Sequence, residues 1–323
     1  MVQSGSNVNG TEADGLRVGE ELGKYRIVER LGTGGESIIY KAHDPVLDRY
    51  VAIKQIAPHL AADEQYRQRF YEIARRLAKL RCEEVVFVHE FIQEPRGMFV
   101  VMEFVEGHTI ETTLANQPGP VEPKAVLQIV WQVAAGLAEV HKAGIIHRDI
   151  KPGNLIVQEG LRVKITDFGV AAPAGVPASV RWGTARYIAP ELLTGVQVDG
   201  RADIYSLGVV AYEMLLGREK FNEIFAEIVR DPDPNVERAR WMKWHGDRSK
   251  VAPALHELDP SIPEALSRIV ARMMAKDPEG RYRNVEELGR DIRASFSPRA
   301  RRPGRRRRGP ALVAGAGGRG GSA

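Results

Sequence analysis

The sequence predicts an α+β fold in two lobes, a small sheet-rich lobe followed by a larger, mainly helical one. Between residues 25 and 104, short runs rich in β-branched and aromatic residues recur, as expected for strands. From residue 123 onward, apolar residues recur at spacings of three and four, as expected for helices. The chain has 323 residues, of which 43% are hydrophobic, enough to bury a core in each lobe. We expect the first lobe at about residues 25–105 and the second at about 106–296.

Both ends of the chain are predicted to be disordered. Residues 1–24 form a polar leader with Gly, Ser and Asn and little to bury. Residues 297–323 form an Arg- and Gly-rich tail, whose eight arginines more than account for the net charge of +4 of the whole chain. The first interpretation of the tail is a solvated segment. The alternative is attraction of the arginines to an anionic membrane or to nucleic acid, although the tail has no interleaved aromatic residues to stack on bases.

The composition excludes several classes of protein. The single cysteine, Cys82, excludes an internal disulfide and favours a reducing compartment, so we expect a cytoplasmic location. The first 23 residues contain no apolar segment of a secretory signal. The most apolar run, residues 204–217, is too short to span a membrane and contains Glu213. We expect this run to be a buried core helix, and we expect no transmembrane helix in this chain.

The first lobe is predicted to hold five strands and one helix. The strands are expected at residues 25–31, 38–42, 51–54, 85–93 and 98–104. The helix is expected over residues 61–80, from the spacing of its apolar residues. A glycine-rich turn at residues 32–37 joins the first two strands, and such a turn lets backbone N–H groups approach phosphate oxygens. Helices of the second lobe are expected at residues 123–143, 204–217, 263–276 and 284–296.

Two motifs lie close together in the second lobe. The run H-R-D-I-K-P-G-N occupies residues 147–154, and D-F-G occupies residues 167–169. Between them, two β-branched runs at residues 155–157 and 163–165 predict a hairpin. The hairpin brings four polar side chains to the mouths of one ribbon: Asp149, Lys151, Asn154 and Asp167. Two carboxylates, an amide and an ammonium in this arrangement could hold magnesium and a phosphate beside a hydroxyl.

These two motifs resemble the catalytic and metal-binding loops of eukaryotic-type (Hanks-type) serine/threonine protein kinases, in particular the bacterial branch of that family. The resemblance covers residues 25–296 and implies the two-lobed protein kinase fold. The implied function is transfer of the γ-phosphoryl group of ATP to Ser and Thr hydroxyls of protein substrates, with autophosphorylation, in signalling. The implied cofactors are ATP and Mg²⁺, with Mn²⁺ as the alternative ion.

The resemblance also assigns roles to individual residues. Asp149 is the implied catalytic base, and Lys151 is implied to steady the γ-phosphate. Lys54, which ends the third strand, is implied to reach the α- and β-phosphates. Thr184 matches a threonine that contacts the base and Lys151 in this family. The implied metal ligands are Asn154 and Asp167.

The nucleotide is expected to lie between the lobes, against the glycine-rich turn and the connector. The expected nucleotide-binding residues are Leu31, Gly32, Thr33, Gly34, Gly35, Glu36, Ser37, Ile38, Ile39, Ala52, Lys54, Met102, Glu103 and Val105. Ser37 stands where the family has its third glycine, which predicts altered nucleotide affinity rather than lost binding.

One position departs from the family pattern. The family places a glutamate on the helix of the first lobe, about nineteen residues after the strand lysine, to pair with that lysine. Counting from Lys54 gives Ile73, while Glu72 lies about 100° away around the helix. Either the register shifts and Glu72 takes the role, or Lys54 lacks its usual partner, which we favour. The rival to an active kinase is therefore a pseudokinase scaffold that regulates a partner.

Several further residues have expected structural or regulatory roles. His147 is expected to be a packed structural histidine, and Asp203 is expected to anchor the backbone of the catalytic loop. Ser179 is a candidate autophosphorylation site, as is Thr184, and an unmodified loop is the alternative. We also expect an interior ion pair between Arg281 and Glu191. Trp241 and Trp244 are expected to be core residues rather than a docking surface.

Overall fold

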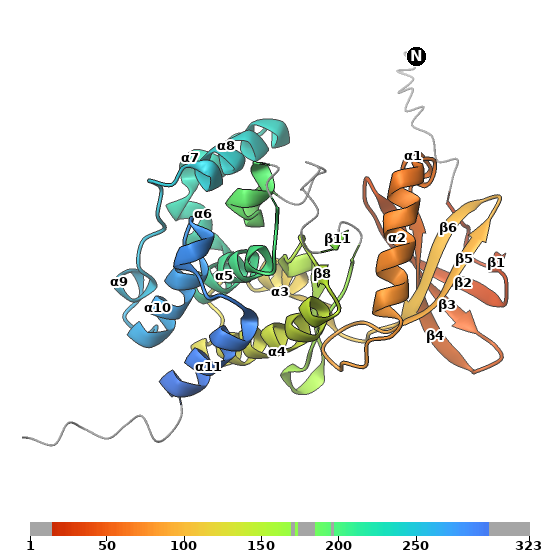
Figure 1. The fold of residues 1–323 in the computed structure, drawn as a ribbon, viewed down its shortest axis with the longest axis horizontal. Helices are drawn as coiled ribbons and strands as arrows, with labels where there is room; N and C mark the ends of the chain where they lie inside the picture. Colours follow the sequence, from red (N-terminus) through yellow and green to blue (C-terminus); the bar gives the residue numbers. More distant parts are fainter. Residues whose placement is uncertain (1–14, 169–171, 174–184, 195–196, 297–323) are drawn as a thin grey trace, which may run out of the picture.

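The computed structural model describes residues 15–168, 172–173, 185–194 and 197–296. The chain folds into two lobes that lie side by side, a sheet with one long helix and a larger group of helices (Figure 1). Thr184 and Ser179 lie outside the described residues. Within the described part of the chain, no helix has both the length and the apolar character needed to cross a membrane.

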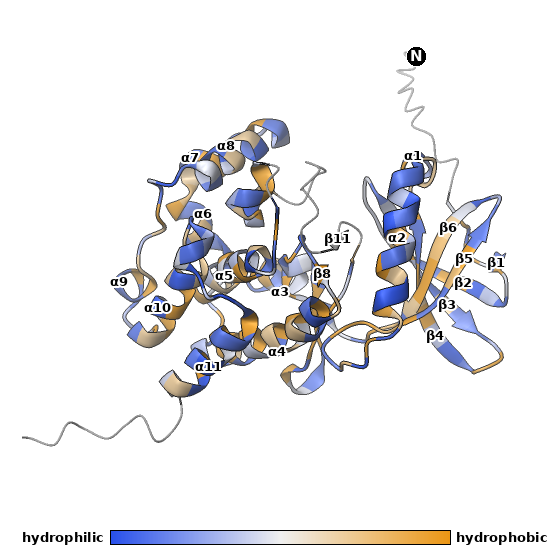
Figure 2. Cartoon of the chain, viewed as in Figure 1, coloured by the Kyte–Doolittle hydropathy of each residue, from blue (hydrophilic) through white to orange (hydrophobic). Residues whose placement is uncertain are grey.

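The first lobe is built on a six-stranded antiparallel sheet with the strand order β1-β2-β3-β4-β6-β5. Its strands are β1 Glu21–Leu22, β2 Tyr25–Thr33, β3 Ser37–Asp44, β4 Arg49–Ile56, β5 Val88–Glu94 and β6 Gly97–Glu103. All five predicted strands are present, with ends that differ by a few residues. Hydrophobic residues run along β6, which lies inside the sheet between β4 and β5 (Figure 2).

The expected disorder of residues 1–24 is wrong for the last ten of these residues. The strand β1 lies within them, and Leu22 is fully buried. Leu16 is also buried, and its backbone N–H donates to the hydroxyl of Tyr40 at 2.9 Å. Single apolar residues in a polar stretch carry no periodicity, so the contact with Tyr40 could not be read from local sequence.

The helix predicted at residues 61–80 is α2 Glu64–Leu77, three residues shorter at each end, and a separate short helix, α1 Pro58–Ala61, precedes it. The break lies at Asp63, whose side chain accepts hydrogen bonds from the backbone N–H groups of Gln65 and Tyr66. An aspartate at this position satisfies the first free donors of a new helix, so α2 begins there. The helix α2 lies beside the sheet and turns a largely hydrophilic surface to the viewer in Figure 2.

The second lobe is centred on the helices α4 Pro123–Lys142 and α5 Arg201–Leu216. Every residue of α5 after the first is buried, including Glu213, which makes α5 an interior helix as predicted. The surrounding helices are α3 Ile110–Asn116, α6 Arg218–Ile224, α7 Ala226–Val229, α8 Pro234–Gly246, α9 Leu255–Leu258, α10 Glu264–Met273 and α11 Val285–Phe296. Short strands complete the lobe: β7 His108–Thr109, β8 Ile145–Ile146, β9 Leu155–Val157, β10 Val163–Ile165 and β11 Ala172–Pro173.

The helix α8 is tied to the segment just before the A-P-E sequence. Trp241 is 1% exposed and Trp244 packs against the same core, which confirms the core assignment of Trp241. The Arg186 guanidinium bonds to Glu237 of α8 at 3.1 Å and lies over the Trp241 ring. The backbone carbonyl of Arg186 accepts a hydrogen bond from His245 Nε2 at 2.9 Å. The two segments are therefore held together by charge, ring and hydrogen-bond contacts.

His245 is expected to make the stability of the fold depend on pH. Burial, assisted by the charge of Lys276, lowers the pKa of His245 to about 3, and the hydroxyl of Tyr205 lies 2.8 Å from its Nδ1. The neutral ring therefore contributes its full stability above the unfolded pKa of about 6.5, and this is lost as pH falls toward 3. Between pH 7.5 and 5, the free energy of urea unfolding should fall by on the order of 2 kcal/mol more for the wild type than for His245→Gln. If the free energy of unfolding changes equally with pH in the two proteins, the protonation of His245 does not change on unfolding.

Candidate active site

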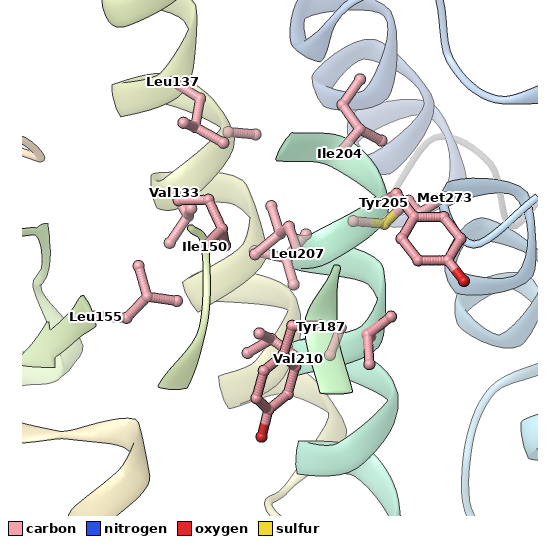
Figure 3. Packing of buried hydrophobic residues seen from close by; sticks show 14 of the residues in the cluster. Val133, Leu137, Ile150, Leu155, Tyr187, Ile204, Tyr205, Leu207, Val210 and Met273 are labelled. Carbon is pink, nitrogen blue, oxygen red and sulfur yellow. The ribbon is translucent and has the colours of Figure 1, made fainter. Parts of the chain in front are cut away.

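The loop between β8 and β9 is anchored by one apolar residue at its centre. Ile150 is 1% exposed and packs in the core between α4 and α5, close to Val133 and Leu207 (Figure 3). Its neighbours Asp149 and Lys151 keep 11% and 27% of their side-chain surface exposed. Burying Ile150 therefore fixes the backbone and leaves the two polar side chains on the open side of the loop.

Asp203 holds the backbone of this loop from below, as predicted. Its carboxylate accepts the backbone N–H of His147 at 2.9 Å and that of Arg148 at 2.8 Å. His141 Nε2 lies 2.8 Å from the same carboxylate. Burial alone would raise the pKa of Asp203, but its hydrogen bond and charge interaction with His141 hold that pKa below its usual value. These contacts hold Arg148 at a φ of 64°, a conformation that few non-glycine residues adopt.

His147 is fully buried and has the structural role expected of it. Its Nε2 lies 3.0 Å from the backbone carbonyl of Thr166, and its ring lies against Phe168. The histidine therefore links the two motifs to each other.

Asp149, Lys151 and Asn154 meet in one polar group. Lys151 Nζ donates to Asp149 Oδ2 at 2.6 Å, and Asn154 Nδ2 donates to the same oxygen at 3.0 Å. Asn154 Nδ2 also reaches the backbone carbonyl of Asp149 at 2.8 Å. Burial would lower the pKa of Lys151, but the charge and hydrogen bond of Asp149 raise it above its usual value. The group holds a carboxylate and an ammonium that stays charged at neutral pH within one hydrogen bond of each other.

The hairpin β9–β10 brings Asn154 next to Asp167. Leu155 pairs with Ile165 at the open end of this hairpin, and the backbone N–H of Thr166 donates to the carbonyl of Asn154 at 2.9 Å. Asn154 precedes the first strand and Asp167 follows the second, so both lie at the same end. The sequence predicted this placement correctly.

The donor set at this end suits a hard divalent cation. Asn154 directs its amide nitrogen to Asp149, which leaves its amide oxygen as a donor for a metal ion. Burial raises the pKa of Asp167, but the charge and hydrogen bond of Lys54 outweigh it and bring the pKa to about 2. Asp167 is therefore a carboxylate at neutral pH, and oxygen ligands of these two kinds are those that Mg²⁺ prefers.

Lys54 extends from the sheet to the second lobe. It lies on β4 opposite Ile39 of β3 and Val100 of β6, and it is 4% exposed. Its ammonium forms an ion pair with Asp167 across the two lobes. A buried ammonium needs such an anionic partner.

Ile73 is one of four residues of α2, all of them apolar, that line the same cavity as Lys54. Both line a cavity of about 40 Å³, together with Met102, Asp167 and Phe168. Glu72 instead pairs with Arg76 at 2.5 Å, and Arg76 also donates to the backbone carbonyls at residues 143 and 144. The register does not shift, so α2 provides no carboxylate for Lys54, as we favoured.

The glycine-rich turn lies between β2 and β3, above the end of β4. It is closed by the backbone N–H of Gly34, which donates to the carbonyl of Ser37 at 2.9 Å. The side chain of Glu36 is half-buried, whereas Gly34 and Gly35 are exposed. Burial raises the pKa of Glu36, and the charge of Lys54 opposes this rise more strongly than any other group. Sequence reasoning placed Glu36 in the turn but gave its carboxylate no role.

The other predicted nucleotide-binding residues lie on β2, β3, β4, β6 and the connector. Ala52 pairs with Met102 in the sheet, and Val105 is buried in the connector. The side chain of Glu103 is held by Lys164 at 2.9 Å. Their contacts with a nucleotide stay a prediction.

A hollow of about 620 Å³ beside Lys151 was not predicted. Glu111 and Arg218 line it and form an ion pair with each other. Behind them, Glu213 accepts hydrogen bonds from the Tyr187 hydroxyl at 2.5 Å and from Arg218 Nε at 2.9 Å. The one sequence feature that could have indicated this cluster is Glu213, an acid inside an otherwise apolar run.

Comparison with known proteins agrees with this geometry. The family model described as protein kinase domain matches residues 25–290. The serine/threonine-protein kinase PrkC of Bacillus subtilis is 31% identical over 286 residues, which cover 87% of this chain and 42% of PrkC. The serine/threonine-protein kinase PknL of Mycobacterium tuberculosis is 33% identical over 275 residues, which cover 84% of this chain and 65% of PknL. The crystal structure of the PknI kinase domain of M. tuberculosis superposes with a TM-score of 0.64 at 27% identity, covering 86% of this chain and 98% of that one.

Proposed function

Because the chain belongs to the protein kinase family, in its bacterial serine/threonine branch, we propose that it transfers the γ-phosphoryl group of Mg-ATP to Ser and Thr hydroxyls of proteins. The observation that carries the proposal is the convergence of two groups of residues. Asp149, Lys151 and Asn154 come from one loop, and the Lys54–Asp167 pair joins the sheet to the segment that follows β10, at the same end of the β9–β10 hairpin as Asn154. Phosphoryl transfer needs such a set, because its catalysis is mainly positioning and neutralisation of charge.

In this mechanism Asp149 accepts the proton of the substrate hydroxyl. Its hydrogen bonds from Lys151 and Asn154 fix the direction in which the carboxylate oxygens point. Lys151 then neutralises negative charge on the phosphoryl group, and Lys54 orients the other phosphates. Asn154 and Asp167 would hold Mg²⁺, which supplies further neutralisation of phosphate charge when bound.

The proposal extends to regulation and location. Autophosphorylation at Ser179 or Thr184 is supported by Arg148, a cation beside the catalytic base. Attraction of the tail to anionic surfaces is supported by its eight arginines. A role in cytoplasmic signalling is supported by the single cysteine and by the family.

The proposed function is tested by transfer of labelled γ-phosphate from ATP to the protein itself and to a basic protein substrate. We expect incorporation with Mg²⁺ or Mn²⁺ and none after chelation of the metal. Lys54→Met should lower kcat/KM for ATP by about 10²–10³-fold, because one preorganised cation at the phosphates is lost. Lys124→Met, which removes an exposed ammonium from the first turn of α4, is the matched control. Bound ATP without any transfer would contradict the proposal and favour the pseudokinase.

A further inference from the structure

The C-terminal end of α4 is bonded to a side chain of the other lobe. The helix ends at Lys142, and the backbone carbonyls of the next two residues, Ala143 and Gly144, accept hydrogen bonds from Arg76 Nη1 of α2 at 3.0 and 3.1 Å. Carbonyls at the C-terminus of a helix carry partial negative charge, which a guanidinium complements. Two charge-assisted hydrogen bonds therefore join α2 to the second lobe.

Gly144 leaves room for this contact. It has a φ of 71°, in the left-handed region, and a Cβ at this position would lie 2.7 Å from Arg76 Nη1. Any other residue would therefore push the guanidinium away. Glu72, one turn earlier on α2, accepts a hydrogen bond from the second terminal nitrogen of the same guanidinium. The Arg76 side chain is thus oriented by its own helix and meets the second lobe at a residue without a side chain.

The opposite face of α2 packs against the residue that follows Asp167. Ile73 and Leu77 belong to one apolar cluster with Phe168, and this cluster continues into the core of the second lobe. All three line the cavity of about 40 Å³ that Lys54 and Asp167 also line. A shift of α2 would remove the packing from Phe168, and through the backbone it would disturb the carboxylate next to it.

Other contacts of α2 hold it to the first lobe. Lys54 does not hold α2 by charge, because the residues of α2 that line its cavity are apolar. Phe70 and Tyr71 lie against the ring of Phe91 on β5, with ring centroids 5.9 and 4.4 Å away. These rings connect α2 to the sheet, and the hydrogen bonds of Arg76 connect it to the second lobe.

We propose that Arg76 is a positioning residue: it fixes α2 against the end of α4 and thereby holds Phe168 and Asp167 in place. Strand β8 begins at the residue after Gly144 and leads into the loop of Asp149, so Arg76 bonds to the backbone from which that loop starts. The consequence for the reaction rests on the proposed function, in which Asp167 holds the metal ion.

The test compares Arg76→Met with Arg75→Met in the full chain by hydrogen exchange. Both changes remove one guanidinium from the last turn of α2, but Arg75 is exposed. We expect Arg76→Met to speed the exchange of α2 amides by about tenfold and to leave α5 unchanged, because only the docking of α2 is lost. Arg75→Met should match the wild type. Unchanged exchange in α2, or equal acceleration in α2 and α5, would overturn the proposal.

A second pair of variants alters the contact from the other lobe. In Gly144→Ala the new methyl group displaces the guanidinium, so α2 should exchange about as fast as in Arg76→Met. Gly160→Ala is the matched control, since Gly160 has a φ of 72° and a Cβ there would meet nothing within 4 Å. Adding Gly144→Ala to Arg76→Met should not speed α2 further, because both changes break one contact. Additive acceleration, or acceleration by Gly160→Ala, contradicts the role.

The effect on the site is measured in two ways. Under the proposed function, Arg76→Met should lower kcat/KM for ATP by about tenfold with the KM for the protein substrate unchanged, and a wild-type value would contradict the positioning of Asp167. Exchange of residues 163–168 should also be faster in Arg76→Met. This result supports the inference even where the wild type shows no phosphoryl transfer, and unchanged exchange there overturns it. Failure of the proposed function and failure of this inference are therefore told apart.

Discussion

Replacing Asp149 by asparagine is expected to lower kcat for phosphoryl transfer by about 10²–10⁴-fold, the contribution typical of a positioned general base. An amide cannot accept the hydroxyl proton. Asn at this position can still accept a hydrogen bond from Lys151, which is 2.6 Å from the carboxylate in the wild type. The loop should therefore keep its shape, because its anchors, Ile150 and Asp203, are untouched. Steady-state rates at saturating ATP measure the effect.

The matched control is Asp48→Asn. Asp48 lies in the turn between β3 and β4, its side chain is 96% exposed, and its φ of 46° is one that asparagine adopts readily. This variant should keep the wild-type kcat. The KM for ATP should be nearly the same in Asp149→Asn and the wild type, because under the proposed function Asp149 meets the protein substrate rather than the nucleotide. A kcat of Asp149→Asn within a few-fold of the wild type would mean that another group takes the proton.

Removing Glu191 is expected to have the largest effect on stability. The Arg281 guanidinium is 0% exposed and bonds to both carboxylate oxygens of Glu191, at 2.6 and 2.8 Å. Glu191→Ala leaves this cation buried without its anion, which costs about 3–5 kcal/mol. Urea unfolding should show a lower midpoint with little change in slope.

A double variant shows whether the loss comes from the stranded charge. Glu191→Leu with Arg281→Met should recover most of the stability, because buried ion pairs and apolar replacements of similar size are often close in energy. The exposed pair Glu264–Arg268, 4.0 Å apart, provides the surface comparison, and Glu264→Ala should change stability by less than about 1 kcal/mol. A double variant as unstable as Glu191→Ala would show that the loss of stability comes from packing rather than from the unpaired charge.

Much of the fold could be predicted because its signals are local. The helices α4 and α5 follow from the spacing of apolar residues, and the hairpin β9–β10 follows from two β-branched runs. The start of α2 after Asp63 follows from another local signal, an N-cap residue, which the spacing of apolar residues alone does not reveal. The position of Leu16 depends on its contact with Tyr40, a residue of the sheet, and no local sequence pattern indicates that contact.

The candidate site also has parts that local sequence predicts and parts that it does not. Asp149, Asn154 and Asp167 lie within one short stretch of chain, so their meeting could be predicted. The inward position of Ile73, which lines the same cavity as Lys54, could be predicted by counting along a regular helix, since the helical repeat fixes which side chains face inward.

Other parts of the site depend on distant pairing. Glu111 meets Arg218 from more than a hundred residues away, and the backbone carbonyl of Glu36 meets the N–H of Ala57 just beyond the end of β4. Neither spacing nor composition contains that information.

The contact between α8 and Arg186 also gives the protein an intrinsic optical reporter. The Trp241 indole donates to Glu237 and lies under the Arg186 guanidinium, and Trp244 packs edge-on against it. Indole emission depends on nearby charge, so displacement of Arg186 changes the fluorescence of this pair without any added label. Rearrangement of the segment before A-P-E can thus be followed by indole fluorescence in a variant that keeps Trp241 and Trp244 and replaces the other two tryptophans, Trp131 and Trp182.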